Sequence, residues 1–532
     1  MATKTAEKVA ALFENYSEVI EPEESIVEGK IPLWLNVSLL RNGPGMFNIG
    51  EYKYKHWFDG LAYMQRFGFA NGKMTYSARY LQSDTYKINM AANRICVNEF
   101  GTFGYSDPCK SVLGKLSTFF TADQLSDNAS VNFMALGDTV WAATETPHLL
   151  QVDPKSLETL NKTDISKIIS LNTFTAHQQY DSEGNLYHIG SKFGKQTEYI
   201  FAVTKNPKNN KSPPPEDNQF AETSVIGTLT ATDDPCYNHS FAMTENYIIL
   251  FETPLRISIL SLLTRSIRGL SFRECMYWKN DVPVFIRILD KRSGKEVSEL
   301  KFRHEPFFSF HQANAYEKEG CIIMDYCQIK KAGDLEQFEL ENLRDNGLQK
   351  TEKDGIAFCS RLVIPLEVDL TKGDVKEGDD IIKGKSFAKG CKAVLKGKNE
   401  IWLEQENLSD IGFEFPRYNM AYNLKPYKYI YGSTLLGSND NFYGLIKMDV
   451  ESREVKTWSR DHQLQIAAEP VFVPNPTGSD EDDGVVLAPI VNFKENDAPF
   501  VVVLDAKTFT EIARCKIGQR LPLGFHAQYY NN

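Results

Sequence analysis

Short apolar runs separated by turn residues dominate the hydrophobic pattern of the chain. Stretches such as "TVWAATET" (139–146), "CIIMDYCQI" (321–329) and "FVVVLDA" (500–506) are alternating or fully apolar, and they are rich in β-branched and aromatic residues. Both patterns are typical of β-strands. Helical periodicity is rarer and predicts helices over about 4–15, 109–126, 255–272 and 335–345. We therefore expect an all-β protein with a few helices.

A loose repeat indicates how the strands are organised. Each copy has an apolar residue, an Asp, a polar turn and a renewed β-run, and Asp is the residue type that caps such turns. The copies are "VDPKSLETL" (152–160), "LDKRSGKEV" (289–297), "MDVESREVKTW" (448–458) and "LDAKTFTEI" (504–512). Scattered copies of this kind favour the outer hairpins of β-propeller blades. Ordinary hairpins of a β-sandwich are the alternative.

Charge and composition exclude several classes of protein. The 532 residues carry a net charge of −11, which argues against a nucleic-acid partner. No run of eighteen apolar residues occurs, so we expect no membrane-spanning helix. The nine cysteines contain no CxxC pair and suit reduced thiols, and the first residues lack the apolar core of a signal peptide. We expect a cytoplasmic protein, with the mitochondrion as the alternative because the start is amphipathic and contains lysine.

Four of the nine histidines lie among aromatic and small residues, and they come from distant parts of the chain: His177, His239, His311 and His526. Singly, each is best explained as a packed core residue. Together, they fit a metal centre assembled from separate strands, because neutral imidazole suits Fe, Zn, Cu or Ni. No short-range ligand motif decides between these interpretations.

A series of ordered motifs resembles the carotenoid cleavage oxygenases over nearly the whole chain. They include "SLLRNGPGMF" (38–47), "HWFDGLAYMQRFGF" (56–69), "TAH" (175–177), "FHQANAYE" (310–317) and "FEFPRYN" (413–419). Within the family, the chain is most similar to the animal branch of β-carotene oxygenases and the retinoid isomerohydrolase. "SIRGLSF" (266–272) and "PLGFHAQYY" (522–530) are most similar to the enzymes that cleave the 9′,10′ bond.

The resemblance implies the fold and the metal site. Residues 1–532 would form a single seven-bladed β-propeller domain with a helical dome over the metal face, built from helices at about 109–126 and 255–272. The four histidines would bind Fe(II). Three glutamates, Glu145, Glu414 and Glu469, would hold His239, His311 and His526 in that order, because a carboxylate that accepts the remote ring N–H fixes the tautomer of a ligand. His177 would lack such a partner.

The implied activity is that of a dioxygenase. With O2 as co-substrate, it would cleave a conjugated C=C bond of a carotenoid or apocarotenoid to two carbonyl products. Phe100, Thr144, Tyr237 and Phe310 lie near the implied metal and dome motifs and are candidates for the substrate tunnel, with core packing as the alternative. A retinyl ester isomerohydrolase of the same family and a non-catalytic carotenoid-binding propeller are the alternative functions.

A substrate that resides in membranes would require the enzyme to dock there as a peripheral protein. Residues 254–272 have Leu and Ile at helical spacing with three Arg and no acidic residue until Glu274, a composition that suits a helix lying in the membrane interface. The predicted contact residues are Leu260, Leu262 and Leu263. Residues 109–120 are similar, and Cys109 is a candidate for acylation. Burial of both helices on the propeller is the alternative.

Overall fold

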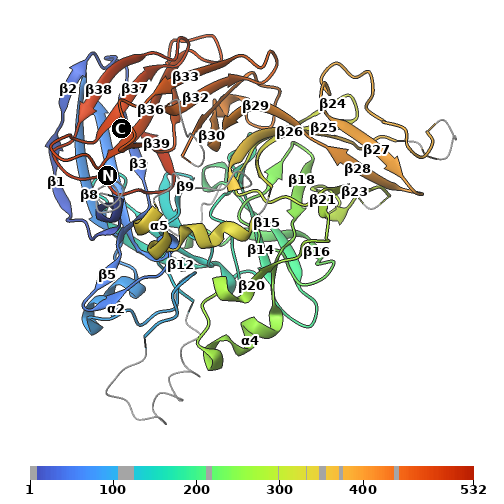
Figure 1. Ribbon diagram of the computed structural model, residues 1–532, viewed down its shortest axis with the longest axis horizontal. Helices are drawn as coiled ribbons and strands as arrows, with labels where there is room; N and C mark the ends of the chain where they lie inside the picture. The colour runs from blue at the N-terminus through green and yellow to red at the C-terminus, as the bar shows by residue number, and fades with distance from the viewer. Residues whose placement is uncertain are drawn as a thin grey trace.

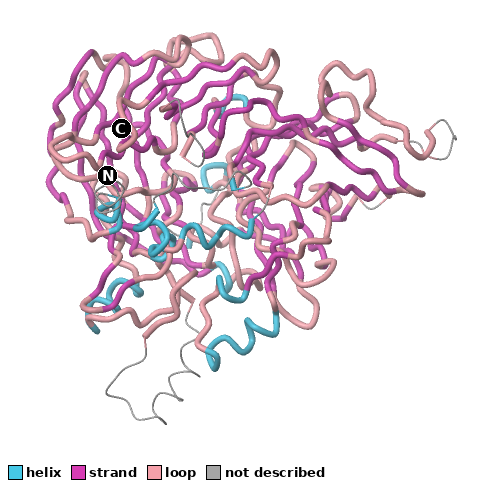
Figure 2. Tube along the Cα trace, in the orientation of Figure 1, coloured by secondary structure: helices cyan, strands magenta, loops and turns pink. Residues whose placement is uncertain are grey.

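The computed structural model describes residues 9–105, 125–210, 218–297, 299–330, 332–346, 355–368, 370, 375–435 and 442–532. Strands far outnumber helices in these stretches (Figure 2). The described strands form seven sheets of four to seven strands each and two isolated pairs. The sheets are arranged around a central axis (Figure 1), so the protein is an all-β propeller with few helices.

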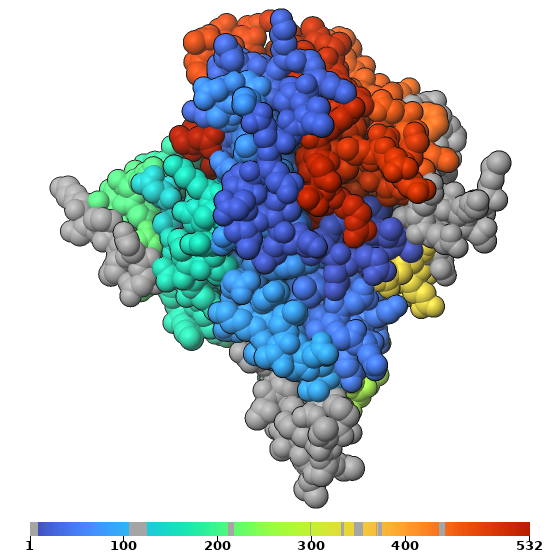
Figure 3. Space-filling model, turned by 90° about the vertical axis from the view of Figure 1, so that its left-hand side faces the viewer, coloured from blue at the N-terminus to red at the C-terminus, as the bar shows by residue number. Residues whose placement is uncertain are grey.

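The two ends of the chain close the ring by sharing two sheets. The C-terminal strand β39 pairs with β3 in one sheet, and the N-terminal strand β2 pairs with β38 in the other. Figure 3 shows the two ends side by side. The first sheet runs β1 (Val19–Glu24), β8 (Lys73–Tyr80), β7 (Leu61–Ala70), β3 (Val37–Arg41) and β39 (Ala527–Asn531), with β4 (Pro44–Met46) beside β7. The second runs β2 (Ile26–Gly29), β38 (Glu511–Lys516), β37 (Phe500–Asp505), β36 (Gly484–Asn492) and β34 (Gln465–Ala467), with β35 (Val471–Pro474) beside β36.

The other five sheets contain no strand from either end of the chain. Four of them are antiparallel and four-stranded. Two of these run β12 (Thr159–Asp164), β11 (His148–Val152), β10 (Thr139–Ala143) and β9 (Asn132–Leu136), and β13 (Gln179–Tyr180), β14 (Leu186–Lys192), β15 (Glu198–Thr204) and β16 (Thr223–Thr230). The other two run β24 (Gln312–Lys318), β25 (Cys321–Ile329), β26 (Ala357–Pro365) and β29 (Glu406–Gly412), and β30 (Glu414–Tyr418), β31 (Tyr429–Ser433), β32 (Tyr443–Asp449) and β33 (Val455–Ser459).

The fifth is larger because it includes a projecting hairpin. It runs β17 (Ala242–Met243), β18 (Tyr247–Glu252), β21 (Val284–Asp290), β23 (Lys301–His304), β28 (Glu400–Glu404) and β27 (Lys392–Lys396), with β22 (Lys295–Glu296) beside β21. The pairing of β23 with β28 is parallel. The isolated pairs are β5 (Asn48–Ile49) with β6 (Tyr52–Lys53), and β19 (Leu255–Ile257) with β20 (Met276–Trp278).

The hydrophobic pattern of a strand agrees with its position in the sheet, whether central or at the edge. Every residue of the mostly apolar central strand β25 is buried, whereas β16, at the edge of its sheet, buries only Thr223 and Leu229. The cysteines of the described residues are unpaired, and most of them are buried among these strands.

The repeated Asp turns are confirmed as hairpin caps. Asp153, Asp290, Asp449 and Asp505 each accept a hydrogen bond through Oδ1 from a backbone N–H two or three residues later. Four residues after each Asp, the chain takes a left-handed conformation, at Leu157, Gly294, Arg453 and Phe509. The shared side-chain type and turn geometry explain why the pattern is detectable in the sequence.

The helices found among the described residues are short. The α-helices there are α2 (Asp84–Ala92), α4 (Ile259–Arg268) and α5 (Leu340–Asn346), and the 3-10 helices are η1 (Ala11–Phe13), η2 (Trp57–Asp59), η3 (Ile165–Lys167), η4 (Pro207–Asn209), η6 (Arg273–Cys275), η7 (Ala332–Phe338) and η10 (Met420–Tyr422). Nearly all of the helix predicted over 109–126 lies outside the described residues. The helix predicted over 255–272 is too long at both ends.

That prediction fails because local hydrogen bonds set the ends of α4. Residues 255–257 pair as a strand with β20, and Ser258 caps the helix by accepting a hydrogen bond from Ser261 N–H. Gly269 ends it with φ of 67°, a left-handed conformation that glycine adopts without strain. The apolar periodicity of the stretch continues past both caps and so overstates the helix.

Candidate metal centre and its cavity

Four histidines from four different sheets converge on one point. His177, His239 and His311 lie within three residues before β13, β17 and β24, the first strand of each sheet, and His526 immediately precedes β39. One ring nitrogen of each lies within 4.8 Å of the others. The Nε2 atoms of His177 and His239 are 2.8 Å apart, and those of His239 and His311 are 3.3 Å apart. The fold therefore brings together the four histidines that were predicted to bind a metal.

The three predicted glutamates face the outer nitrogens of these rings. Glu145 Oε1 lies 2.6 Å from His239 Nδ1, Glu414 Oε2 lies 2.5 Å from His311 Nδ1, and Glu469 Oε1 lies 3.0 Å from His526 Nδ1. A carboxylate accepts a proton from Nδ1, which leaves the Nε2 lone pair free to point inward. Among the described residues, no carboxylate faces the ring of His177.

The donor set fits a divalent transition metal. Unprotonated Nε2 atoms at such short separations repel one another, and a cation between them turns that repulsion into coordination. Burial, followed by the neighbouring imidazoles, lowers the pKa of His177 well below its usual range, and burial lowers the pKa of His526 to about 4. Both rings are thus neutral, which is the form that binds metals. Four neutral imidazoles suit Fe, Zn, Cu or Ni.

Each glutamate is held differently. Glu145 also accepts a hydrogen bond from the Tyr237 hydroxyl at 2.6 Å. Glu414 Oε2 accepts from its neighbour's backbone N–H, while Glu414 Oε1 is buried without a hydrogen-bond partner. Glu469 accepts from Ala527 N–H at 2.6 Å and forms an ion pair with Arg417 at 3.1 Å. Burial raises the pKa of the Glu469 carboxyl, but Arg417 and His526 lower it by more, to about 2.

Arg417 was not singled out by the sequence analysis. It lies in the quoted motif "FEFPRYN", three residues after Glu414, but β30 turns its guanidinium toward Glu469 and the backbone of Ala527. Strand β30 thus contributes to the positions of two histidines: His311 directly through Glu414, and His526 through Arg417 and Glu469. The motif alone does not show this double role.

A large aromatic cavity adjoins the metal centre, with an empty space of about 1250 Å³ including its mouth. All four predicted tunnel residues line it, namely Phe100, Thr144, Tyr237 and Phe310. The wall also contains aromatic residues that were not predicted from the sequence: Trp57, Phe58, Phe272, Phe338, Phe415 and Phe525. All of them except Phe338 lie inside the quoted motifs, and that placement was the available signal.

The rings of the wall pack closely around the histidines. Phe310 meets His239 edge to face at 5.1 Å between centroids, and Phe58 stacks on Phe338 at 5.5 Å. Phe415 lies 5.4 Å from His311 and 5.1 Å from His526, with a left-handed φ of 55°. Non-glycine residues in this region are strained and cluster at functional sites. A long apolar ligand in this cavity would therefore contact the faces of aromatic rings.

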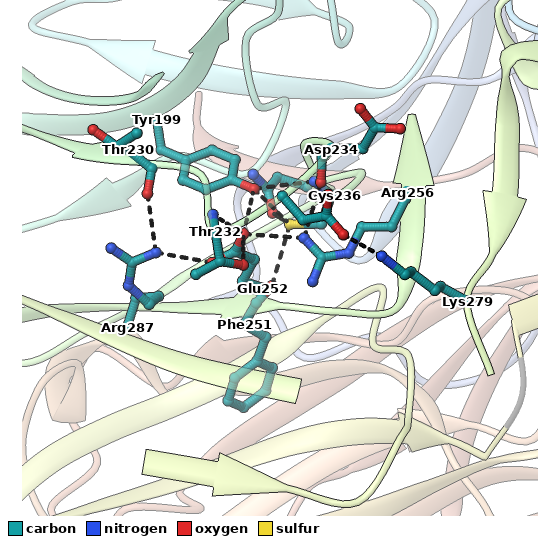
Figure 4. Close-up of polar contacts among 12 residues, drawn as sticks. Tyr199, Thr230, Thr232, Asp234, Cys236, Phe251, Glu252, Arg256, Lys279 and Arg287 are labelled. Carbon is teal, nitrogen blue, oxygen red and sulfur yellow. Dashed lines mark hydrogen bonds and ion pairs between the residues drawn. The ribbon is translucent and has the colours of Figure 1, made fainter. Parts of the chain in front are cut away.

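A buried polar network holds the segment that leads to His239 (Figure 4). Glu252 accepts hydrogen bonds from the backbone and hydroxyl of Thr232, and it pairs with Arg256 at 3.0 Å and Arg287 at 2.9 Å. Arg256 also donates to the carbonyl of Asp234 at 3.0 Å. The network therefore fixes residues 232–236, immediately before Tyr237 and His239.

The predicted membrane-contact residues separate in the structure. Leu260 and Leu263 on α4 are 73% and 78% exposed, whereas Leu262 is partly buried and packs against the core. Ile267 is 79% exposed and completes the apolar face instead. Cys109 lies outside the described residues. No helix in the described part of the chain is long and apolar enough to cross a membrane.

Fold and site together define a propeller protein with a four-imidazole metal centre beside an aromatic cavity. The family model for the retinal pigment epithelial membrane protein matches residues 12–531, and the chain belongs to this family. The resemblance to carotenoid cleavage oxygenases is thereby confirmed at the level of the family.

Named relatives and solved structures agree with this assignment. The chain is 37% identical over 525 residues to β,β-carotene 15,15′-dioxygenase of Mus musculus, covering 97% of this chain and 90% of the mouse protein. It is 37% identical over 544 residues to the mitochondrial carotenoid-cleaving dioxygenase of Pongo abelii, covering 98% and 94%. A variant of the Synechocystis apocarotenoid oxygenase has the same fold, with a TM-score of 0.77, 21% identity and 99% of each chain covered.

Proposed function

We propose that the protein is a non-haem Fe(II) dioxygenase that cleaves a conjugated C=C bond of a carotenoid or apocarotenoid to two carbonyl products. The observation that carries this proposal is the convergence of four imidazoles beside an aromatic cavity of about 1250 Å³. Relatives at 37% identity are named as dioxygenases of carotene or carotenoids. The motifs at 266–272 and 522–530 favour the 9′,10′ bond.

In this proposal, His177, His239, His311 and His526 hold the iron, whose chemistry when bound is the activation of O2. Glu145, Glu414 and Glu469 keep the three facing rings in the Nδ1–H tautomer and aim Nε2 at the metal. Arg417 restrains Glu469. The buried network of Glu252 holds the segment that presents His239.

The cavity wall positions the substrate. Phe100, Thr144, Tyr237 and Phe310 would hold the polyene so that one double bond lies beside the metal centre. Holding two reactants in register converts a bimolecular step into an effectively unimolecular one. The aromatic wall also keeps water away from the reacting carbons.

The architecture proposed around this site is a single domain over residues 1–532. The seven sheets of four or more strands found among the described residues would be its seven blades. The helices α2, α4 and α5 lie on one side of the sheets (Figure 1), and we take them as part of a dome over the metal face.

The reaction is tested by loading the protein with Fe(II) anaerobically and incubating it with β-carotene or an apocarotenal under ¹⁸O-labelled O2. The expected products are two carbonyl compounds whose carbons sum to those of the substrate, and their masses identify the bond. Products with label from the gas phase exclude a retinyl ester isomerohydrolase. Bound pigment without turnover by the iron-loaded protein would favour the non-catalytic carotenoid-binding propeller and overturn the proposal.

The Glu414→Gln variant tests the support of the histidines. The substitution keeps the size of the side chain but removes the negative charge that accepts the His311 N–H. Loss of such an outer partner costs ~10–100-fold in metal affinity. We expect a drop in this range, measured by competition with a chelator for Fe(II) or Co(II). Glu404→Gln, an exposed residue on β28, is the matched control, and equal affinities of the two variants would contradict the role of Glu414.

Docking on a membrane through α4 is proposed from its exposed face. Leu260, Leu263 and Ile267 are 73–79% exposed on one side of the helix, and Arg265 and Arg268 fall in its last turn. Exposed apolar side chains with cationic neighbours suit the surface of an anionic bilayer. We propose peripheral association in the cytoplasm. Since relatives are named as mitochondrial, the mitochondrion is the alternative, and imaging of a tagged protein separates the two.

Changing Leu260, Leu263 and Ile267 together to Ser is expected to lower the affinity for anionic liposomes by ~100-fold or more, measured by co-sedimentation. Three buried aliphatic side chains contribute ~1.5–3 kcal/mol each when they leave water. A control variant replaces Ile20, Ile26 and Leu33, which are 51–80% exposed elsewhere, with Ser. The same loss in both variants would show that the face on α4 has no special role.

A further inference from the structure

One carboxyl group in the cavity wall has no part in the metal centre. Glu99 lies in the loop after α2 and lines the cavity beside Asn98, Phe100 and Ser126. Much of the remaining wall is aromatic. A carboxyl group in apolar surroundings is costly unless it is neutral or has hydrogen-bond partners.

The hydrogen bonds of Ser126 assign roles to the two oxygens of this carboxyl. Ser126 Oγ accepts from Asn128 N–H at 3.1 Å and lies 2.7 Å from Glu99 Oε1. Ser126 Oγ also lies 3.4 Å from Thr85 Oγ1, which is a longer and weaker contact. The serine hydroxyl therefore donates to Oε1 at the shorter distance, and a proton on the carboxyl of Glu99 is carried by Oε2. No ion pair with Glu99 is found in the described part of the chain, so no cation there holds it as a carboxylate.

The electrostatic surroundings agree with a protonated group. Burial, and then the nearby carboxyl of Asp59, raise the pKa of Glu99 well above its usual range. Burial of this kind favours the protonated carboxyl, which can donate an O–H from Oε2. Thr146 Oγ1 donates to the Ser126 carbonyl at 2.7 Å, so this polar patch is continuous with the wall segment that carries Glu145.

We propose that Glu99 is a specificity-determining residue that donates a hydrogen bond to an oxygen atom of the substrate. Polyenes with a hydroxyl or carbonyl group would be preferred over hydrocarbon polyenes. The inference rests on the proposed function, since it takes this cavity to be the polyene site. A hydrocarbon leaves the O–H of Glu99 without an acceptor, whereas an oxygenated polyene supplies one, and sites built in this way discriminate against the analogue that lacks the polar group.

The test compares β-carotene with zeaxanthin, which carries a hydroxyl group on each ring. For the wild type, Glu99→Leu and Glu99→Gln, kcat/KM is measured with the iron-loaded protein, and Kd is measured by quenching of tryptophan fluorescence. Trp57 lines the cavity and reports binding without turnover. Glu51→Leu, at an exposed turn, is the matched control.

We expect the wild type and Glu51→Leu to prefer zeaxanthin by about tenfold or more in both measurements. Glu99→Leu should lose that preference by binding zeaxanthin more weakly. Glu99→Gln should keep most of it, because the amide still donates to the substrate and accepts from Ser126. A wild type that prefers β-carotene, or an unchanged preference in Glu99→Leu, would overturn the inference.

The two proposals fail in different ways. If neither polyene is turned over but the Kd ratios follow the expected order, the dioxygenase proposal fails while the role of Glu99 stands. If Glu99→Leu does not fold, as judged by circular dichroism, Glu99→Ala replaces it. Loss of the preference in Glu99→Gln as well would show that the carboxylate form is required, and would overturn the donor role.

Discussion

Replacement of His311 by alanine is expected to abolish iron binding and product formation together. The variant removes one of four converging ring nitrogens and leaves Glu414 buried, 2% exposed in its side chain, without its imidazole partner. Removing an outer partner alone costs ~10–100-fold in metal affinity, so loss of a ligand should cost more. We expect less than roughly a tenth of the wild-type iron content after gel filtration, and cleavage at background level.

His462→Ala is the matched control for this variant. His462 belongs to a partly exposed ion pair with Asp497 at 3.0 Å, far along the chain from the four converging histidines. Its replacement should leave iron content and turnover unchanged. Wild-type iron content in His311→Ala, measured by inductively coupled plasma mass spectrometry on folded protein, would refute the four-histidine site.

Replacement of Glu252 by leucine is expected to give the largest loss of stability of the predicted changes. Glu252 is fully buried and is shared by Arg256, also fully buried, and Arg287, which is 11% exposed. Breaking a buried ion pair from one side costs ~3–5 kcal/mol, because the remaining charge stays buried without compensation. The N–H and hydroxyl of Thr232 lose their acceptor as well.

Urea unfolding followed by circular dichroism measures this loss as a fall in the midpoint. Glu404→Leu is the control, since Glu404 forms an exposed pair with Lys392, and such pairs contribute only ~0–1 kcal/mol. Equal midpoints for the two variants would show that the network around Glu252 is not a stabilising unit. A folded fraction of Glu252→Leu with reduced iron affinity would show that the network also positions His239.

Motifs, more than periodicity, located the site in the sequence. The four histidines and three glutamates lie in short, recognisable motifs, and the folded chain places each glutamate against the histidine with which it was paired. Arg417 and Glu99 were missed, although Arg417 lies inside a quoted motif and Glu99 directly precedes the predicted tunnel residue Phe100. Their roles depend on side-chain direction and on neighbours from other strands, which no local spacing reveals.

The difference in exposure between Leu262 and its neighbours has a simple physical origin. Apolar residues continue from 254 to 272, so the sequence shows a longer helix than the one that its caps allow. Within α4, the exposed apolar face follows positions 260, 263 and 267, while position 262 turns toward the core. The broad apolar composition could not separate the two faces, because leucine and isoleucine occur on both.

The pairing of β39 with β3 has a consequence for the kinetics of folding. This pairing joins residues 37–41 to residues 527–531, so the loop between the two strands spans most of the sequence. Contacts between residues so far apart in sequence form slowly, because the entropy of closing the intervening loop is lost before the contacts stabilise the chain. His526 immediately precedes β39, so the group of four imidazoles would be complete only after the ring closes, whichever sheets form first.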